Sequence, residues 1–235
     1  MRLDKFVSDA ASLTRSEARK IIKGGRIKVA GSTVKDISYH VESDAEVFFD
    51  ENKISYREFI YIMLNKPRGF VSATEDRRQR TVLELIDVSY MRYKPFPVGR
   101  LDIDTEGFLL LTNDGEMAHN LIAPNKNFGK TYFLILENEI SESDIKILEA
   151  GVDIGDIVTK PAQIKRIAQN EIEITITEGK FHQIKRMAAA VGNKVTYLKR
   201  ISYGKLCLDT TLKTGEYREL TEEETQYLYN VYKRK

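Results

Sequence analysis

The stretch "GRLDIDTEGFLLLTNDG" (residues 99–115) decides how this chain is interpreted, because it joins a charged turn to an apolar run. Asp102 and Asp104 stand two residues apart in the turn. The run "FLLL" that follows (108–111) is typical of a buried β-strand. The turn can hold a metal ion, it can be a solvated surface turn, or it can present one catalytic carboxylate with a second beside it.

Calcium and nucleotide sites need particular spacings, and the sequence does not provide them. A calcium loop requires an oxygen ligand at its ninth position and a glutamate at its twelfth. Counted from Asp102, those positions are Leu110 and Asn113. A phosphate loop ending in "GKT" (129–131) needs a glycine five residues earlier, where Pro124 stands. A magnesium role for the paired aspartates stays open, although no further acidic cluster offers a second half of such a site.

A catalytic carboxylate is the third interpretation of the turn. An aspartate is ionised at neutral pH, so it needs no general base before it acts as a nucleophile. A buried carboxylate stays ionised only beside a positive partner or hydrogen-bond donors. Arg100 and the adjacent Lys185 and Arg186 are the candidate partners of Asp102. That Asp102 merely caps a turn before the strand is the alternative.

The composition excludes several classes of protein. The 235 residues are 42% hydrophobic and 31% charged, which suits a soluble globular protein of one large or two small domains. Cys207 is the only cysteine, so neither a disulfide framework nor a thiolate metal site is available. No apolar run reaches the roughly 18 residues of a membrane span, and "MRLDKFVSDAAS" (1–12) has no signal-peptide core. We therefore expect a cytoplasmic protein.

Basic residues are concentrated in two segments of a chain whose net charge is only +2. Residues 1–40 contain nine basic and four acidic side chains, and residues 180–206 contain seven basic and no acidic ones. Residues 41–59 contain two basic and six acidic side chains. Two basic segments suggest a polyanionic partner such as a nucleic acid, although ordinary solvated faces also fit the pattern.

Residues 1–58 are predicted to form a small module. Apolar spacing predicts a helix over residues 3–10, and the capping box "TRSE" (14–17) begins a second helix that ends at Gly24. The alternating "RIKVAGSTVK" (26–35) predicts a hairpin, and residues 42–58 look like a strand end followed by a linker. The basic residues of the second helix share one face, because they recur at three- and four-residue steps: Arg15, Arg19, Lys20 and Lys23.

A second domain is expected over residues 59–235. β-forming residues predict strands at 59–64, 128–137 and 171–178. Helical spacing with start and stop signals predicts helices at 141–152 and 181–192. Because these elements do not alternate as βαβ units, the fold class is predicted to be α+β with a mixed or antiparallel sheet.

Several long motifs together resemble one family. "VGRLDIDTEGFLLLTNDG" (98–115), "KTY" (130–132) and "EGKFHQIKRMAAAVGNKV" (178–195) resemble, in family order, the signature regions of the RsuA-type pseudouridine synthases. "MLNKPRGFVSAT" (63–74) resembles their first catalytic-domain strand and turn. "LTRSEARKIIKGGRIKVAG" (13–31) is similar to the RNA-binding module of small-subunit ribosomal protein four. The resemblance covers essentially the whole chain and implies a mixed, largely antiparallel sheet in the catalytic domain.

The resemblance implies roles for individual residues. Asp102 corresponds to the catalytic aspartate of the family, and Arg100 to the arginine that helps take the uridine out of the base stack. Tyr132 corresponds to the aromatic residue that stacks on the target base. Lys185 corresponds to the basic residue that pairs with the aspartate, and Leu198 to the apolar residue that packs against the base.

The chain departs from the family pattern at the cation beside Asp102. Many relatives have arginine where Lys185 stands, and lysine lacks its two-pronged geometry, so Arg186 is the alternative partner. Asp104 is expected to serve turn geometry only. Contacts with RNA are expected from basic side chains in both segments: Arg2, Arg15, Arg19, Lys20, Lys23, Arg26, Lys28 and Arg186.

The implied reaction is the isomerisation of a uridine in ribosomal RNA to pseudouridine. Substrate and product have the same composition, so we expect neither a cofactor nor a metal ion. The chain most resembles members that modify uridine 516 of the 16S small-subunit rRNA. We expect a cytoplasmic monomer that acts on ribosomal RNA or an assembling ribosomal subunit, away from membranes. The alternatives are a large-subunit (23S) enzyme of the same family, a non-catalytic RNA-binding assembly factor, and a metal-dependent phosphoryl-transfer enzyme.

Overall fold

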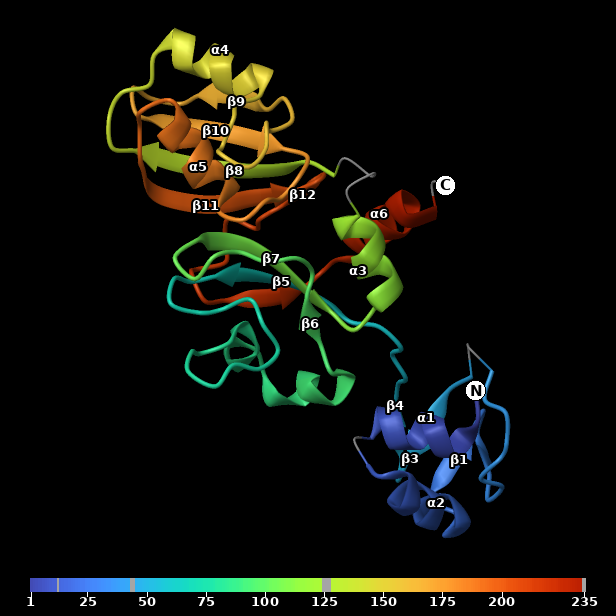
Figure 1. Cartoon of the computed structure of the whole chain (residues 1–235). Coiled ribbons are helices and arrows are strands. Elements are labelled where there is room, and N and C mark those ends of the chain that lie inside the picture. Colours follow the sequence, from blue (N-terminus) through green and yellow to red (C-terminus); the bar gives the residue numbers. More distant parts are fainter. Residues whose placement is uncertain (12, 43–44, 124–127, 234–235) are drawn as a thin grey trace. The chain divides into compact units, whose positions relative to one another are not determined.

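The chain divides into two compact units, Met1–Phe59 and Ile60–Lys235. The structure, a computed structural model, describes residues 1–11, 13–42, 45–123 and 128–233 (Figure 1). Each unit has its own cluster of buried apolar side chains. Each unit therefore has the core it needs to be stable as a body of its own.

The N-terminal unit packs two helices against a small sheet. Its helices are α1 (Leu3–Ala10) and α2 (Arg15–Lys23). The sheet has the order β2-β1-β3-β4, with these bounds: β1 (Ile27–Val29), β2 (Ser32–Thr33), β3 (Val47–Phe49) and β4 (Asn52–Ile54). The core lies between the helices and the sheet, where Leu3, Ile22 and Ile27 are completely buried.

The predicted start of the second helix is confirmed. Thr14 Oγ1 accepts a hydrogen bond from the Glu17 backbone N–H at 3.2 Å, and Glu17 Oε2 accepts one from the Thr14 backbone N–H at 2.8 Å. The prediction of a strand end and linker over residues 42–58 is wrong, since β3 and β4 form a hairpin there. Its two turn residues, Asp50 and Glu51, have φ of 45° and 65°. Such turns usually contain Asn or Gly, so the sequence carries little signal for this one.

The C-terminal unit is built on a nine-stranded sheet of order β13-β5-β7-β11-β8-β10-β9, with β12 paired to β11 and β6 to β7. Only β7 and β11 run parallel among these pairs, so the predicted α+β fold with a mixed, largely antiparallel sheet is confirmed. The strands are β5 (Tyr61–Lys66), β6 (Phe96–Pro97), β7 (Glu106–Thr112), β8 (Lys130–Leu136), β9 (Gln163–Arg166), β10 (Glu171–Ile176), β11 (Val195–Tyr203), β12 (Leu206–Cys207) and β13 (Tyr217–Glu219).

Helices cover this sheet in two places. The helices α4 (Glu142–Ala150) and α5 (Gln183–Ala190) lie over the half of the sheet that contains β8 to β11 (Figure 1). The helices α3 (Gly115–Ile122) and α6 (Glu222–Lys233) pack side by side, and two short 3-10 helices span Val82–Leu85 and Val88–Tyr93. Within the described ranges no helix has the length and apolar character needed to cross a membrane.

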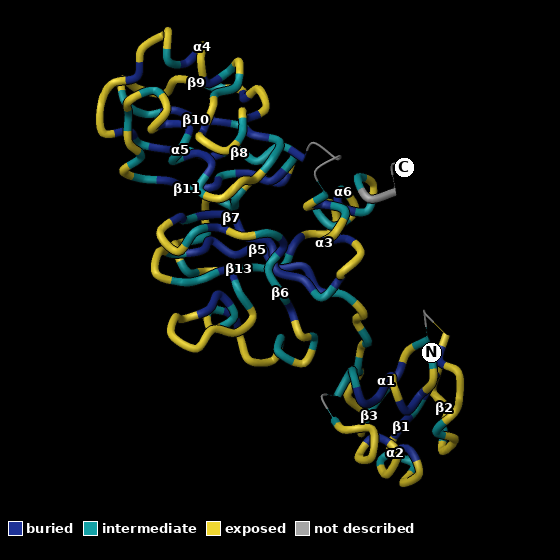
Figure 2. The backbone as a smooth tube through the Cα atoms, viewed as in Figure 1, coloured by how far each residue is buried: buried dark blue, intermediate teal, exposed yellow. Residues whose placement is uncertain are grey.

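The central strands are the most deeply buried part of the C-terminal unit (Figure 2). Every residue of β5 is buried, including Lys66 at its end, and six of the seven residues of β7 are buried. Gly107 near the start of β7 has φ of 100°, and a Cβ atom there would collide with the backbone of Arg200 on β11. Glycine at this position therefore allows the two parallel strands to approach each other directly after the Asp102 turn.

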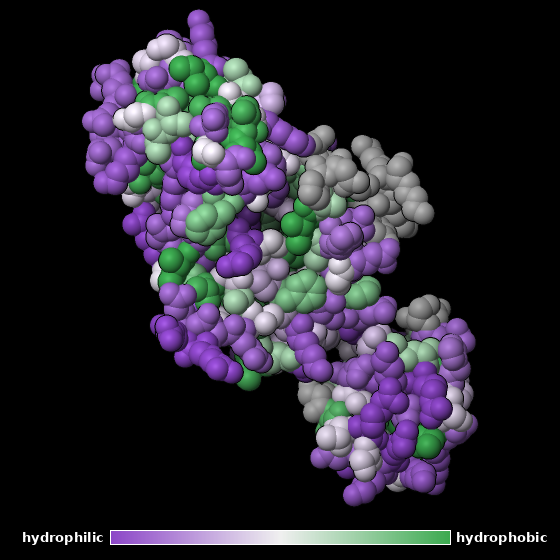
Figure 3. Space-filling view, viewed as in Figure 1, coloured by the Kyte–Doolittle hydropathy of each residue, from purple (hydrophilic) through white to green (hydrophobic). Residues whose placement is uncertain are grey.

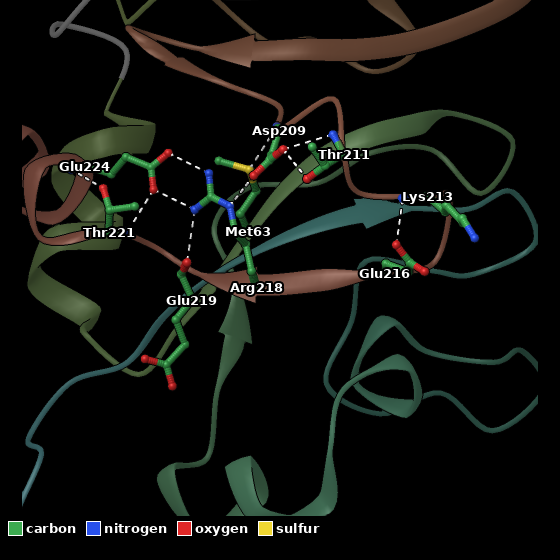
Figure 4. A network of polar contacts seen from close by, with 9 residues as sticks. All are labelled: Met63, Asp209, Thr211, Lys213, Glu216, Arg218, Glu219, Thr221 and Glu224. Carbon is green, nitrogen blue, oxygen red and sulfur yellow. Dashed lines mark hydrogen bonds and ion pairs between the residues drawn. The ribbon is translucent and has the colours of Figure 1, made fainter.

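A polar network joins the last helix to an edge of the sheet (Figure 4). Arg218 on β13 contacts Asp209 at 2.6 Å through Nε and Glu224 of α6 at 2.7 Å through Nη1. Glu224 also accepts a hydrogen bond from the Thr221 backbone N–H at 2.8 Å. Through these contacts Arg218 fixes the first turn of α6 against β13 and the 209–211 turn.

Candidate active site

A buried lysine, Lys66, forms hydrogen bonds to the backbone of the Asp102 turn. The Thr105 backbone N–H donates to the Asp102 carbonyl at 3.1 Å, which closes the turn. Lys66 Nζ donates to the carbonyl oxygens of Asp102 (3.0 Å) and Thr105 (2.8 Å), and more weakly to that of Ile103 (3.4 Å). The Lys66 side chain is completely buried. One ammonium group thus forms hydrogen bonds to three carbonyl oxygens of the turn.

Two further hydrogen-bond donors, Ser72 and Gly69, fix the backbone of residues 101–103. Ser72 Oγ donates to the Leu101 carbonyl and accepts from the Leu101 N–H, both at 3.0 Å. The Gly69 N–H donates to the Ile103 carbonyl at 2.8 Å. Because the backbone is held on both sides of Asp102, the direction of its side chain is set by the fold before any substrate binds.

Lys66 was not among the residues selected from the sequence, although one signal was present. It ends a strand that is otherwise apolar or uncharged, "YIMLN" (61–65), where a lysine is unusual. Burial lowers the pKa of Lys66 to about 8, and the nearby carboxylates of Asp104, Asp102 and Glu106 oppose that shift. The lysine therefore remains largely protonated at neutral pH and keeps its donors directed at the turn.

Lys185 on α5 lies between the two aspartates of the turn. Its Nζ is 3.2 Å from Asp102 Oδ2 and 2.6 Å from Asp104 Oδ1. Burial alone would lower the pKa of Lys185, but the hydrogen bonds and charges of Asp104 and Asp102 raise it. Burial would raise the pKa of Asp104, and the hydrogen bond from Lys185 outweighs that effect and lowers it.

These contacts correct two expectations. The alternative partner, Arg186, does not contact Asp102, because its guanidinium pairs with Asp156 and donates to the Ile154 carbonyl at 3.1 Å through Nε. The expectation that Asp104 serves turn geometry alone is wrong, because its carboxylate makes the shorter of the two contacts with Lys185. The two aspartates differ in exposure, at 30% for the Asp102 side chain and 59% for that of Asp104.

His182 is a second residue that sequence reasoning missed. Its Nε2 lies 3.8 Å from Asp102 Oδ2. It occupies the position before α5 with φ of 49°, an unusual conformation for a residue other than glycine. The signal available was its place in "KFHQIK" (180–185), three residues before the predicted cation. The structure thus surrounds the Asp102 carboxylate with one lysine and one imidazole.

The two residues assigned to the target base lie on neighbouring strands. Tyr132 on β8 and Leu198 on β11 are 8% and 6% exposed, and both belong to the core cluster that includes Leu101. Leu198 also lines a shallow pocket together with Lys185 and Asp104. The structure therefore brings Leu198 next to the charged turn, while Tyr132 lies along the same sheet.

Arg100 stands two residues before Asp102 and is exposed. Among the described residues it forms no ion pair or hydrogen bond, so its guanidinium is free to move. No group of three or more histidine, cysteine, aspartate or glutamate side chains in the described ranges is arranged to hold a metal ion. The arrangement around Asp102 thus offers a carboxylate with a cation rather than a set of metal ligands.

The basic residues of the N-terminal unit fall into two groups. Arg2, Arg15 and Arg19 surround the completely buried Asp4 at 3.2, 3.7 and 3.1 Å, while their own side chains are about half exposed. Burial would raise the pKa of Asp4, but hydrogen bonds from Arg2 and Arg19 and the charge of Arg15 hold it below its ordinary value. Three arginines share one carboxylate, so the group carries an excess of positive charge.

The second group consists of the basic residues of the hairpins, and its charge is largely neutralised by carboxylates. Arg26 pairs with Asp50, and Lys28 Nζ lies 2.6 Å from Glu51 Oε1. Lys20 and Lys23 on α2 are exposed and form no ion pair among the described residues. The space-filling view shows a mainly hydrophilic surface on this unit (Figure 3). The uncompensated positive charge therefore comes from α2 and Arg2 rather than from the hairpins.

Comparison with known proteins identifies the family of the chain. The family described as "RNA pseudouridylate synthase" matches residues 60–190, and the family described as "S4 domain" matches residues 1–47. Ribosomal small subunit pseudouridine synthase A of Escherichia coli (strain K12) is 39% identical over 227 residues, covering 95% of this chain and 98% of that protein. The chain belongs to the RsuA-type pseudouridine synthases.

Other relatives place this RsuA-type chain in the same family. An uncharacterised RNA pseudouridine synthase of Bacillus subtilis (strain 168) is 52% identical over 235 residues, covering 97% of this chain and 98% of that protein. A crystal structure of a pseudouridylate synthase, 37% identical, superposes with a TM-score of 0.68 and covers 97% of this chain and 99% of its own. The chain is an enzyme of the pseudouridine synthase family that acts on RNA.

Proposed function

We propose that this synthase converts uridine 516 of the 16S small-subunit rRNA to pseudouridine, with Asp102 as the catalytic group. It works as a cytoplasmic monomer on ribosomal RNA or an assembling subunit, without a cofactor or a metal ion. Support for the small subunit comes from relatives over the full chain length, including the small-subunit synthase of Escherichia coli.

The observation that carries the catalytic assignment is the 3.2 Å contact between Lys185 Nζ and Asp102 Oδ2 on a turn fixed by Lys66 and Ser72. A carboxylate beside a cation stays ionised even where the substrate excludes water. It can then act on the ribose or the base without a separate general base. A protein that only binds RNA has no need for this arrangement, which counts against the non-catalytic alternative.

The proposed reaction mainly requires the enzyme to position the target uridine against Asp102. The bond between ribose and the base nitrogen breaks, the base turns, and a bond forms to a base carbon, which loses its proton while the released nitrogen gains one. The target base must first leave its stack, which costs a few kcal/mol. Arg100, which has no partner among the described residues, is available to help take the uridine out of the stack, and Tyr132 and Leu198 provide the apolar contacts for the base.

The N-terminal unit supplies affinity for the RNA. The uncompensated arginines around Asp4 and the free lysines of α2 are suited to phosphate groups, which position a protein without reading sequence. Binding that depends on such contacts weakens as salt concentration rises. The unit therefore determines how tightly the RNA is held, and the Asp102 site determines what is done to it.

The test uses a strain that lacks the gene and is complemented with the wild-type chain or with Asp102→Asn. We expect the wild type to restore pseudouridine at position 516 and the variant to restore none, while the purified variant binds 16S rRNA as tightly as the wild type. Restoration of a 23S site instead would assign the chain to the large subunit. Normal pseudouridine formation by Asp102→Asn would refute the catalytic assignment.

A further inference from the structure

Phe181 is an apolar side chain exposed beside the catalytic turn. It leaves 75% of its surface open to solvent, whereas Tyr132 leaves 8%. Its ring stacks on His182, with ring centroids 3.8 Å apart and planes inclined by 20°. His182 Nε2 is in turn 3.8 Å from Asp102 Oδ2. One face of the phenylalanine ring therefore rests on the imidazole next to the carboxylate, and most of the rest of the ring faces solvent.

The backbone that carries this ring is held firmly. The Phe181 carbonyl accepts a hydrogen bond from Arg186 Nη1 at 3.3 Å. The Lys180 N–H donates to Gln183 Oε1 at 2.9 Å, and Gln183 Nε2 donates to Glu178 Oε1 at 2.9 Å. The hydrogen bonds around residues 178–183 therefore keep the exposed ring in one position beside the Asp102 turn.

The surroundings indicate what the ring recognises. Lys180 is adjacent in sequence and exposed, whereas the charges of Lys185 and Arg186 on α5 are already paired with carboxylates. An exposed aromatic ring beside an exposed lysine suits a single nucleic-acid strand, because a base stacks on the ring while a phosphate meets the charge. Apolar contact with another protein would not require this charge.

We propose that Phe181 is the stacking platform for the nucleobase next to the target uridine in the RNA strand. When the target base leaves the stack, its neighbour loses a stacking partner, and the ring on His182 replaces that partner. Phe181 is thus a positioning residue, because it holds the strand while Asp102 acts on the flipped nucleotide. The proposal rests on the activity proposed above, but it can be tested by binding alone.

The activity test compares three substitutions in the full chain. Phe181→Ala and Phe181→Leu should lower kcat/KM by about 5- to 100-fold, the range expected for loss of one base–aromatic stack, and Phe181→Trp should stay within about threefold of the wild type. Val88→Ala is the matched control, because Val88 is 81% exposed on a separate 3-10 helix. A leucine variant as active as the wild type would mean that aromatic stacking is not involved.

A matched change in the RNA identifies the base. An RNA with an abasic nucleotide on one side of the target uridine should lose as much activity with the wild type as Phe181→Ala loses on normal RNA. The alanine variant should then lose nothing further on that RNA, because both changes remove the same contact. The proposal would be contradicted if the losses from Phe181→Ala and from the abasic site were fully additive in both RNAs, the one with the abasic nucleotide before the target and the one with it after the target.

The binding readout separates this proposal from the catalytic one. In an Asp102→Asn background, 2-aminopurine placed beside the target uridine should lose fluorescence on binding, through stacking on Phe181. Adding Phe181→Leu should abolish that quenching. Quenching that depends on Phe181 supports the platform even if Asp102→Asn proves active, and quenching unaffected by Phe181→Leu removes the platform even if Asp102 is confirmed as catalytic.

Discussion

A charge cluster in the N-terminal unit and the cluster at the Asp102 turn of the C-terminal unit have opposite balances. In the N-terminal unit one carboxylate, Asp4, is shared by three arginines, and in the C-terminal unit one lysine, Lys185, is shared by two aspartates. The shared group is completely buried in the first cluster and 26% exposed in the second. Each cluster thus presents the charge that it has in excess, which is positive in the first and negative in the second.

The largest effect in this comparison should come from removing the lysine of the second cluster. Lys185→Met leaves Asp102 and Asp104 side by side without a cation, so we expect pseudouridine formation to fall about 100-fold or more. Lys185→Arg keeps the charge with a different geometry and should lose less. Tritium release from RNA labelled at the uracil carbon that becomes bonded to ribose measures both variants. Equal activity of the methionine and arginine variants would show that the charge of Lys185 is dispensable.

A smaller effect is expected from removing the shared carboxylate of the first cluster. Asp4→Asn adds positive charge, yet we expect RNA to bind about three- to tenfold more weakly, because the arginines lose the group that orients them. The free energy of unfolding should fall by about 1–3 kcal/mol. Asp50→Asn makes the same charge change beside Arg26 at an exposed site and should not weaken RNA binding. If Asp4→Asn bound RNA more tightly than the wild type, net charge rather than orientation would govern affinity.

The stability difference at Asp4 should also depend on pH. Its pKa is below the ordinary value of 3.8 in the folded chain, so its stabilisation is complete above the unfolded pKa and is lost as the pH falls through the folded one. Chemical unfolding of the wild type and Asp4→Asn at a series of pH values measures this. The difference between them should be constant near neutral pH and shrink below about pH 4. A difference that persisted in strong acid would point to packing instead of charge.

The smallest effect is expected at Asp104, the more exposed partner of Lys185. Asp104→Asn leaves Lys185 with Asp102 alone, so we expect a change in kcat of less than about tenfold, against complete loss for Asp102→Asn. The pKa of Lys185 should fall, since one of the carboxylates that raise it is gone. Equal losses for the two asparagine variants would show that the aspartates act as one unit, and the contrast between them would disappear.

The sequence predicted those features that depend on neighbours along the chain or on long motifs. The capping box at Thr14 and the fold class follow from local pattern, and both are confirmed. The pairing of Asp102 with Lys185, across 83 positions of the printed sequence, followed only from the resemblance to a family. Spacing alone had left a turn cap and a metal site as alternatives.

The remaining features depend on atoms that the sequence does not bring together. Nothing local shows that Lys66 meets the carbonyl of Asp102, which is 36 residues away. The link between Asp104 and Lys185 spans 81 residues and arises only when α5 lies over the turn. The hairpin turn at Asp50 and Glu51 adopts a backbone conformation that these residue types rarely take.

Lys66 gives the Asp102 turn an internal counterpart of a bound alkali cation. Its ammonium group is ringed by carbonyl oxygens, as a potassium ion would be, but it is tethered to β5 and cannot dissociate into the medium. The shape of the turn is therefore independent of the ions in solution and sensitive to alkali. Above about pH 8 the amine loses a hydrogen and one carbonyl loses its donor. Between there and pH 10.5 the folded chain holds fewer protons at this group than the unfolded one, so the cost to stability of burying the charged lysine shrinks as the pH rises, while the hold of Lys66 on the turn weakens.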